Sequence, residues 1–433
     1  MRRRGLASLA WASVQDLFDQ RTAFGRLALV HVVMMAGDKL VTVSLAGSLF
    51  FSVSPTEAKS KVLAYLLLTI APFAVVSPVL GPLIDRSANG RRILVAVSAS
   101  ARVLLCWSMS QHLNSLWLFP EAFAVLISSK LYGVTRGALV PEMARTDQFH
   151  EHTTDVGHAG WPTEGARQVR GFAGFNAQLT LLGTLSGIIA GSVGAAILKT
   201  LGATSVLVVA AAVFAAGTVV SLRLQRPAKV VRDEVVMSPG ERDLHVLNPL
   251  GEGEVTWGLG ASALMRFGVG FGSFLLAFGL RREHAGLQWF ALALSASAVG
   301  SLLGLGLVTR VRNALAESTL LALAVLVTGL GAGLASRHPT LIVQTALAGW
   351  LGLGAAVAQP SFDAITQRLV PTGAQGRTFA RFAVRQQLAW VLGALIPVAI
   401  SLDFAAGDQF LALVMVVGGV VYATGRRISH HGT

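Results

Sequence analysis

Charged residues are scarce in this sequence. They make up 13% of the 433 residues, whereas hydrophobic residues make up 53%. Soluble domains carry roughly a quarter charged residues, so a single soluble core cannot bury this much apolar surface. The excess predicts that a lipid bilayer surrounds most of the chain.

Cysteine is almost absent, and the usual catalytic patterns are missing. Cys106 is the single cysteine, so the chain cannot form an intramolecular disulfide, and we expect this side chain to serve packing. The sequence contains no phosphate-binding loop, no strand-linked dinucleotide fingerprint, and no conjunction of nucleophile, base and metal ligands. We therefore predict that the protein is not an enzyme and needs no cofactor.

One polar stretch suggests a metal site at first sight. His150, Glu151, His152, Asp155 and His158 follow one another in a glycine-containing segment. Their alternating spacing fits no standard zinc pattern. We predict a solvated loop here, and no metal.

The net charge of +13 does not indicate a nucleic-acid partner. Lysine and arginine fall in short clusters between apolar runs and form no continuous basic face. The start, MRRRGLASLAWASV, is similar to a secretory signal, but Asp16, Asp19 and Arg21 follow before any plausible cleavage site. We expect this segment to be retained on the cytoplasmic side.

The apolar runs have the length of membrane-spanning helices. A helix needs roughly 20 apolar residues to cross the hydrocarbon layer. By this measure we predict twelve spans, of which those near 93, 319 and 409 are short, so that eleven remains an alternative. They cover residues 27–51, 62–84, 93–110, 116–137, 172–198, 204–222, 257–280, 287–308, 319–335, 340–363, 382–402 and 409–423.

The spans divide into two sets of six around a polar stretch. The halves also resemble each other, because LYGVTRGALVP ends the fourth span and SFDAITQRLVP ends the tenth, with Pro141 and Pro371 at matching places. Internal duplication is typical of transporters. The predicted segments are a cytoplasmic N-terminal segment 1–26, a six-helix bundle 27–222, a cytoplasmic linker 223–256, a second bundle 257–425 and a cytoplasmic tail 426–433.

Arginine and lysine predict the orientation. Loops on one side carry most of the arginines, while the opposite loops hold little beyond a few lysines and arginines. Cytoplasmic loops are enriched in these residues. We therefore place both termini and the linker in the cytoplasm, in a bacterial-type inner (plasma) membrane. The fold class is all-α integral membrane, with about twelve transmembrane helices in two pseudo-symmetric six-helix bundles.

A loop after the second span carries a family resemblance. The segment GPLIDRSANGRR contains Gly81, Asp85, Arg86, Arg91 and Arg92 and resembles the loop signature of the major facilitator superfamily. In that family the loop lies at the seam between the halves. A glycine allows close helix approach, the aspartate can accept hydrogen bonds from a helix N-terminus, and arginines anchor the loop. A merely topogenic basic loop is the alternative.

Shorter stretches are similar to a bacterial exporter branch. GDKLVTVSLAG resembles an exporter-type first helix through Gly37 and Asp38. GTLSGIIAGSVG resembles the antiporter glycine motif, but Ile188 stands where a proline is expected. RGALVPEM and FNAQL are similar to siderophore and macrolide efflux proteins. The resemblance implies a transporter that exports its substrate.

Ionisable side chains inside a span are functional candidates, because each costs about 2.5–3.5 kcal/mol to insert. Asp38 lies in the first span with His31 on the same stripe. We interpret Asp38 as a proton-titrating or cation-recognising group; the alternative is a static ion pair with Lys130, Arg102 or Arg266.

Four further spans contribute polar candidates. Tyr132 shares a face of the fourth span with Ser129 and Arg136. Arg266 lies too deep in the seventh span to reach water easily, and we expect it to hold an anionic substrate group or to neutralise Asp38. Gln359 and Asp363 follow helical spacing on the tenth span, and Arg381 belongs to a similar row on the eleventh. These rows predict a gate of ion pairs, with simple positive-inside anchoring of the arginines as the alternative.

Together these features predict a secondary active transporter that works by alternating access and exports an amphipathic small molecule, drug or lipid-like metabolite in exchange for protons. The alternatives are an uptake permease for a small organic solute and a non-transporting membrane sensor or assembly protein. The expected partners are a small-molecule substrate, protons and the lipid bilayer, without nucleic acid, and we expect a monomer.

Overall fold

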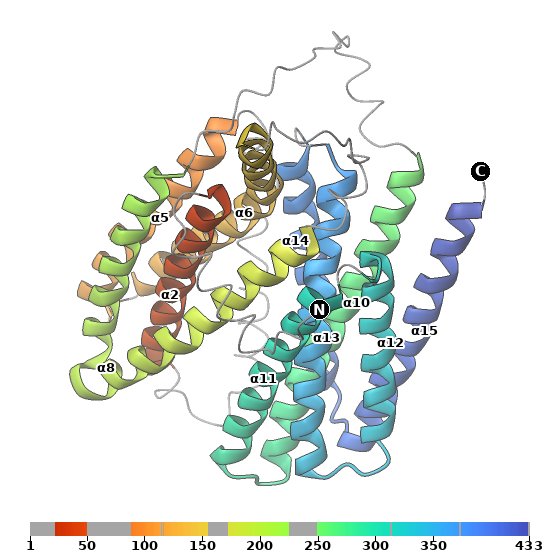
Figure 1. Cartoon of the computed structure of the whole chain (residues 1–433). Coiled ribbons are helices and arrows are strands. Elements are labelled where there is room, and N and C mark those ends of the chain that lie inside the picture. The colour runs from red at the N-terminus through yellow and green to blue at the C-terminus, as the bar shows by residue number, and fades with distance from the viewer. Residues whose placement is uncertain are drawn as a thin grey trace.

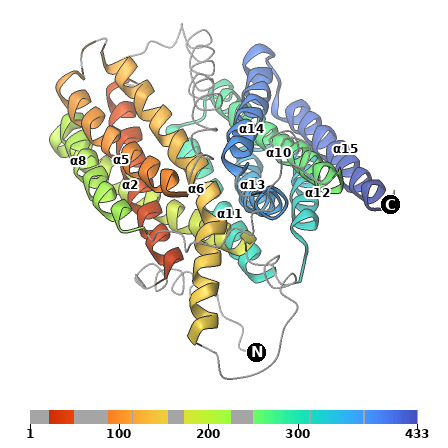
Figure 2. The same cartoon turned by 90° about the horizontal axis from the view of Figure 1, so that it is seen from above.

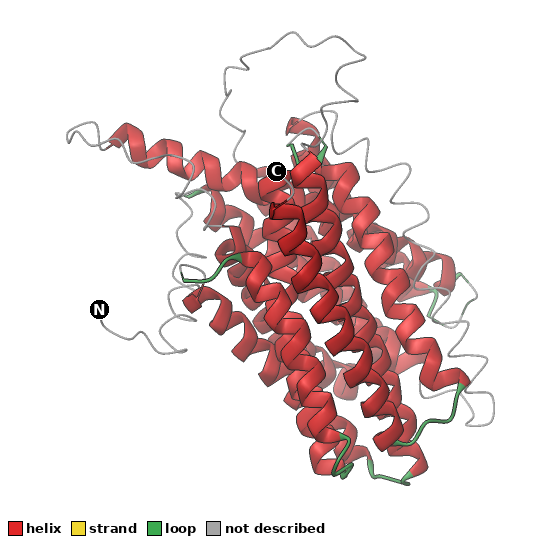
Figure 3. Ribbon diagram, turned by 90° about the vertical axis from the view of Figure 1, so that its right-hand side faces the viewer, coloured by secondary structure: helices red, strands yellow, loops and turns green. Residues whose placement is uncertain are grey.

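The apolar runs of the sequence form long helices in a computed structural model of the chain. The structure describes residues 22–49, 88–113, 115, 117–154, 172–224, 249–311, 314–371 and 374–431. Within these ranges every regular element is a helix (Figure 3). A helix satisfies its own backbone hydrogen bonds, which is what a lipid environment requires of a spanning segment.

Ten helices are described, and all ten are long and apolar enough to cross a membrane. In chain order they are α2 (Ala23–Leu49), α5 (Ala88–Gln111), α6 (Leu118–Thr154), α8 (Phe172–Leu222), α10 (Pro249–Arg282), α11 (Leu287–Val311), α12 (Glu317–Ala335), α13 (Leu341–Leu369), α14 (Gln375–Ala399) and α15 (Phe404–His431).

Eleven of the twelve predicted spans lie in these helices, because α8 contains two. Its backbone leaves the helical region at Gly202 (φ 80°, ψ 175°), a conformation that favours glycine because it has no Cβ atom. Figure 1 shows the two arms of α8 meeting at a sharp bend. The predicted span 62–84 lies outside the described residues, as do Gly81, Asp85 and Arg86.

Several helices extend beyond the predicted limits, among them α6 and α10, and α15 continues through most of the predicted tail to His431. α6 continues through Pro141 to Thr154, so His150, Glu151 and His152 belong to a helix, and the predicted loop is wrong there. His158 lies outside the described residues. α10 begins at Pro249, inside the stretch predicted as linker. Polar extensions carry no hydropathy signal, which is why composition missed them.

The helices form two groups. α2, α5, α6 and α8 pack on one another, and α10 to α15 pack among themselves. Figures 1 and 2 show these groups side by side, and α6 and one arm of α8 face α11, α13 and α14 of the other group. Contacts between the groups join α8 to α11 and α13, and α6 to α14.

Glycine residues allow neighbouring helices of the second group to touch. A Cβ atom at Gly270 of α10 would collide with the carbonyl of Trp390 on α14, and one at Gly393 of α14 with the carbonyl of Phe267 on α10. Gly300 of α11 meets the backbone of α13 in the same way. Small residues at helix contacts are typical of membrane bundles.

The surface and the core have the distribution of a membrane protein. Large apolar side chains such as Leu104, Leu294 and Ile342 are about 70% or more exposed, whereas Arg102, Tyr132 and Cys106 are buried. Exposed apolar side chains face lipid at no hydrophobic cost. The chain is an all-α, multi-pass membrane protein.

Candidate functional site

A buried ion pair lies inside the first group of helices. Arg102 of α5 donates to Asp38 of α2 at 2.7 Å, and its side chain is fully buried. The other carboxylate oxygen of Asp38 accepts from the Ser129 hydroxyl at 2.7 Å. Nε and Nη2 of Arg102 bind the carbonyl and hydroxyl of Ser98 at 3.0 and 3.2 Å. Asp38 is therefore ion-paired with Arg102, one of the three partners named for it above.

The glycine before this aspartate has a packing role. The Arg102 guanidinium lies 4.8 Å from the ring centroid of Phe214, on the second arm of α8. A Cβ atom at Gly37 would lie 2.6 Å from that same ring. Gly37 thus leaves room for the ring of Phe214. Arg102, the ion-pair partner of Asp38, makes a cation–π contact with this ring.

A second polar chain runs beside the ion pair. His31 Nδ1 lies 3.1 Å from the Tyr132 hydroxyl, and His31 Nε2 lies 3.2 Å from Arg136 Nη1. Arginine can only donate, so Nε2 acts as the acceptor and Nδ1 carries the proton. In this arrangement His31 is neutral.

The second group of helices contributes an arginine, an amide and a carboxylate. Arg266 of α10 donates to Gln359 Oε1 at 3.0 Å, and Gln359 Nε2 donates to Asp363 Oδ1 at 2.8 Å. Electrostatic attraction also connects Asp363 with Arg136 of the first group, and the charges of Lys130 and Arg266 repel each other. Charged side chains of the two groups therefore act on each other across the seam.

A cavity of about 210 Å³ lies between the two groups. Its polar lining includes Arg266 and Gln359, which the sequence predicted, and residues that it missed. The missed polar residues are Thr180, Thr184, Ser262 and Ser301, and Met265 and Leu305 supply apolar walls. The hydroxyls on α8, at i and i+4, share a helix face, and this spacing was the available signal. His31, Asp38, Lys130, Tyr132 and Asp363 are not among the lining residues.

Amide groups close the seam at one end. Gln367 of α13 accepts from Asn176 of α8 at 2.7 Å, and its Nε2 donates to the Gly137 carbonyl of α6 at 3.0 Å. Phe379 of α14 covers Gly137 and belongs to an apolar cluster with Leu94, Leu131, Val134, Ala138 and Ala380. This end of the seam is sealed by neutral groups.

The predicted gate residues have different places. Arg91 donates to the Ala138 carbonyl at 3.3 Å and pairs with Glu142 at 3.5 Å. Arg92 donates to the Leu222 carbonyl at 3.2 Å. Both therefore fasten α5 to neighbours in its own group, at the sealed end. Arg381 is exposed on α14. Among the described residues no cluster of histidine, cysteine, aspartate and glutamate has the composition of a metal site.

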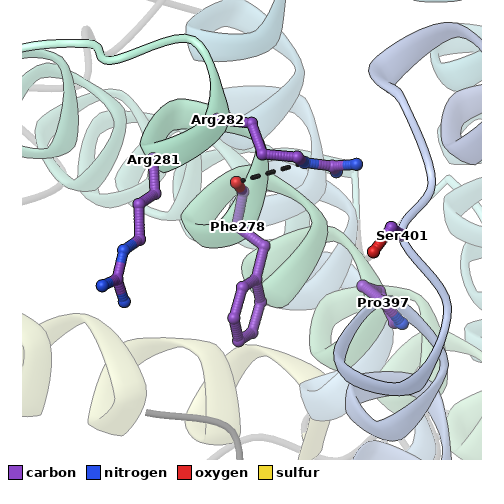
Figure 4. Close-up of a pocket in the computed structure, with 5 residues that line it drawn as sticks. All are labelled: Phe278, Arg281, Arg282, Pro397 and Ser401. Carbon is purple, nitrogen blue, oxygen red and sulfur yellow. Dashed lines mark hydrogen bonds between the residues drawn. The ribbon is translucent and has the colours of Figure 1, made fainter. Parts of the chain in front are cut away.

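A second pocket, also of about 210 Å³, lies at the opposite end of α10 and α14. Phe278, Arg281, Arg282, Pro397 and Ser401 line it. Arg282 donates to the carbonyls of Phe278, at 3.4 Å, and Leu402. Figure 4 shows the guanidinium groups of Arg281 and Arg282 pointing in different directions, so they do not form one binding site.

Three solved structures with a similar arrangement of helices are transporters. The chain is similar to the human organic anion transporter MFSD10, with a TM-score of 0.64, 14% identity, and coverage of 95% of this chain and 99% of that chain. A bacterial homologue of the iron transporter ferroportin in an outward-facing state has a TM-score of 0.64 and 15% identity, with coverage of 94% of this chain and 99% of that chain. The major facilitator superfamily transporter FucP in the outward conformation has a TM-score of 0.64 and 12% identity, with coverage of 93% of this chain and 98% of that chain.

These likenesses define the class of fold: the chain has the major facilitator fold of two six-helix bundles.

No family model matches the sequence. It is 30% identical over 432 residues to the uncharacterized protein ML2143 of Mycobacterium leprae, covering 89% of this chain and 68% of that protein. It is 34% identical over 228 residues to the uncharacterized protein Rv0876c of Mycobacterium tuberculosis, covering 49% of this chain and 36% of that protein. The chain belongs to the same family as ML2143.

Proposed function

We propose that the protein is a secondary transporter that moves a small organic solute by alternating access. The observation that carries this proposal is the cavity between the two bundles, polar on several sides and sealed at one end by Gln367, Asn176 and Gly137. A binding site at the interface of two related bundles is reached from each side in turn when the bundles rock.

The internal repeat supports the rocking motion. Pro141 and Pro371 occupy matching places in the two repeats, and they are separated by 230 residues, as are Gly137 and Gln367. Gly137 and Gln367 are therefore counterparts, and they contact each other. Two equivalent positions meet only close to the axis that relates the halves. Rotation about such a point opens one end of the seam while closing the other.

The membrane and the orientation are part of the proposal. The arginine-rich loops support cytoplasmic termini, and the mycobacterial relatives support a bacterial inner membrane. In this orientation the sealed end faces the cytoplasm, and we propose that the cavity of the described state opens outward. The outward-facing states of the ferroportin homologue and FucP are consistent with that assignment.

Proton coupling is supported at His31 more than at Asp38. Asp38 already holds a fully buried arginine and a serine, whereas neutral His31 accepts a single hydrogen bond from Arg136 on its Nε2 atom. A proton on Nε2 removes this bond and places a positive charge beside Arg136. Repulsion then turns Arg136 toward the carboxylate of Asp363 across the seam. Proton entry supplies about 2.3 kcal/mol per charge at 100 mV.

The cavity size favours a small solute. Its volume of about 210 Å³ lies below the roughly 300–1,000 Å³ of pockets that hold drug-sized ligands. We therefore propose a small organic solute rather than a lipid-like molecule. Export is the proposed direction, and it follows from the resemblance to bacterial exporters.

A reversible lock tests alternating access. A Cβ atom at Gly137 would lie 3.4 Å from the Phe379 ring, so cysteines at both positions are close enough for a disulfide across the sealed end. We expect proteoliposomes with Gly137→Cys and Phe379→Cys, loaded with a bacterial metabolite extract, to lose solute flux on oxidation and to regain it with dithiothreitol. Gly137→Cys alone is the control and should not respond to oxidant. Ligand binding with no net flux in the wild type would instead identify a sensor.

Everted vesicles test the direction. In respiring inside-out vesicles, an exported solute accumulates in the lumen, and mass spectrometry identifies it. Accumulation in right-side-out vesicles only would reverse the proposed direction and identify an uptake permease.

A further inference from the structure

The hydroxyl groups of α8 offer acceptors to the cavity. Thr180 Oγ1 donates to the Asn176 carbonyl and Thr184 Oγ1 donates to the Thr180 carbonyl, each at 2.8 Å. Ser301 on α11 likewise donates to the Ser297 carbonyl at 2.8 Å. Since each hydroxyl has one hydrogen and two lone pairs, these three groups can accept hydrogen bonds from a ligand but have no hydrogen left to donate.

Donors lie on the opposite wall, on α10. Ser262 accepts from Gln386 Nε2 at 2.7 Å, so its own hydrogen stays available to a ligand. Arg266, one helical turn further along, has five N–H groups, and it donates one of them to Gln359 Oε1 at 3.0 Å. The α10 wall is therefore donor-rich and positive, whereas the α8 wall is acceptor-rich and neutral.

Cations outnumber carboxylates among the described charged residues that act on one another in this part of the seam. Electrostatic interactions connect four cations, Arg102, Lys130, Arg136 and Arg266, with two carboxylates, Asp38 and Asp363. Asp38 is bound to Arg102, which leaves Asp363 close to Arg136 and Arg266. Lys130 and Arg266 come from different bundles and repel each other, so an anion bound to Arg266 in the cavity weakens a repulsion across the seam.

From this arrangement we infer that the cavity binds a small hydroxylated carboxylate. The carboxylate pairs with the Arg266 fork and the Ser262 hydroxyl, and the ligand hydroxyls donate to Thr180, Thr184 and Ser301. Arginine matches a carboxylate with two parallel hydrogen bonds. This inference deepens the proposed transport function and rests on it for the role of the ligand as a substrate.

Two sets of compounds, matched in carbon number, separate the contributions of charge and hydroxyls. One set is tartrate, succinate and threitol, and the other is gluconate, hexanoate and sorbitol. Within each set the first compound has both features, the second has the charge alone and the third has the hydroxyls alone. Binding is measured on the purified full-length protein as the rise in Tm with ligand concentration. In at least one set the hydroxy acid should raise the Tm more than both counterparts, and the inference is overturned if it does so in neither set.

Substitutions on each wall of the cavity test whether α10 selects the carboxylate and α8 selects the hydroxyls of the ligand. Arg266→Gln should weaken binding of the hydroxy acid roughly tenfold or more and leave binding of the matched polyol unchanged. Thr180→Val with Thr184→Val should bring the affinity for the hydroxy acid down to that of the plain acid. Arg281→Gln, on the same helix but outside this cavity, is the matched control. Retained acid preference in Arg266→Gln, with the variant folded by size-exclusion chromatography, contradicts the inference.

Failure of the carboxylate assignment can be distinguished from failure of the transport function. If polyols bind and are transported while hydroxy acids are not, the transport function stands and the carboxylate assignment falls. If a hydroxy acid binds through Arg266 but no flux occurs in proteoliposomes, the carboxylate site stands and the transport function falls.

Discussion

Gln367 donates a hydrogen bond to the carbonyl of Gly137, its own counterpart in the internal repeat, at 3.0 Å. The same amide accepts from Asn176 at 2.7 Å. One side chain thus connects α13 to two helices of the other bundle, close to the axis that relates the halves.

Removal of this amide should open the sealed end. Gln367→Leu removes three side-chain hydrogen bonds, at 2.7, 3.0 and 3.4 Å. The two shorter ones contribute roughly 0.5–1.5 kcal/mol each, so the population should move toward the state open at that end by a factor of about 5 to 150 or more. Spin labels at the exposed positions Arg223 and Arg377 should report a longer distance by electron–electron resonance. Gln288→Leu, an exposed position on α11, is the control, and an unchanged distance in Gln367→Leu would contradict the role of the amide as a latch.

Loss of the Asp38 carboxylate should destabilise the first bundle. Asp38→Asn leaves the fully buried Arg102 without its counter-charge, and breaking a buried pair costs about 3–5 kcal/mol. The Tm in detergent should fall strongly, whereas Ser129→Ala, which removes one hydrogen bond, should lose about 1 kcal/mol. Arg102→Met together with Asp38→Leu should recover part of the loss. An Asp38→Asn protein with unchanged Tm but no proton-coupled flux would restore Asp38 as the titrating group.

His31 should determine the pH dependence of transport. A proton on Nε2 breaks the hydrogen bond from Arg136, so flux is compared over a series of pH values from neutral to acidic. His31→Gln has no such group, so its flux should vary little with pH over that range while the wild type varies. Flux measured in proteoliposomes at fixed solute gradient checks this. Equal pH profiles for both proteins would remove His31 from the coupling.

Gly183 and Gly191, two glycines of the GTLSGIIAGSVG segment on α8, should respond differently to substitution by alanine. A Cβ atom at Gly183 would lie 2.6 Å from His31 Nε2, whereas nothing lies within 4 Å of one at Gly191. Gly183→Ala should displace His31 from Arg136 and lower both Tm and flux. Gly191→Ala should stabilise the helix by up to about 1 kcal/mol, from its higher helix propensity. Similar Tm values for the two variants would show that His31 adapts to the extra methyl group.

The spans were predictable because hydropathy follows directly from burial in lipid. Each segment must be apolar along one helix length, and eleven of the twelve predicted spans coincide with described helices. Helix ends were predictable only where the apolar run also ended. The polar turns of α6 beyond Pro141 lie past the apolar run, so composition could not separate a helix from a loop there.

The site was predictable where charge interrupts an apolar run. Asp38 and Arg266 stood out for that reason, but the choice of Arg102 as the partner of Asp38 depends on the packing of α2 against α5 and on Phe214. Thr180 and Thr184 offered only their i, i+4 spacing and Ser301 offered no signal, because hydroxyls inside helices normally bond to the carbonyl of the preceding turn, as these do. Their position on the cavity wall follows from the helix contacts alone.

The burial of Cys106 makes the natural sequence a ready background for thiol chemistry. The one native sulfhydryl group is enclosed by α5 and its neighbours, so maleimides and spin labels should attach to introduced cysteines with little signal from the unmodified chain. Conversely, slow alkylation of the wild type under turnover would report how often the interior of the first bundle becomes accessible to reagent.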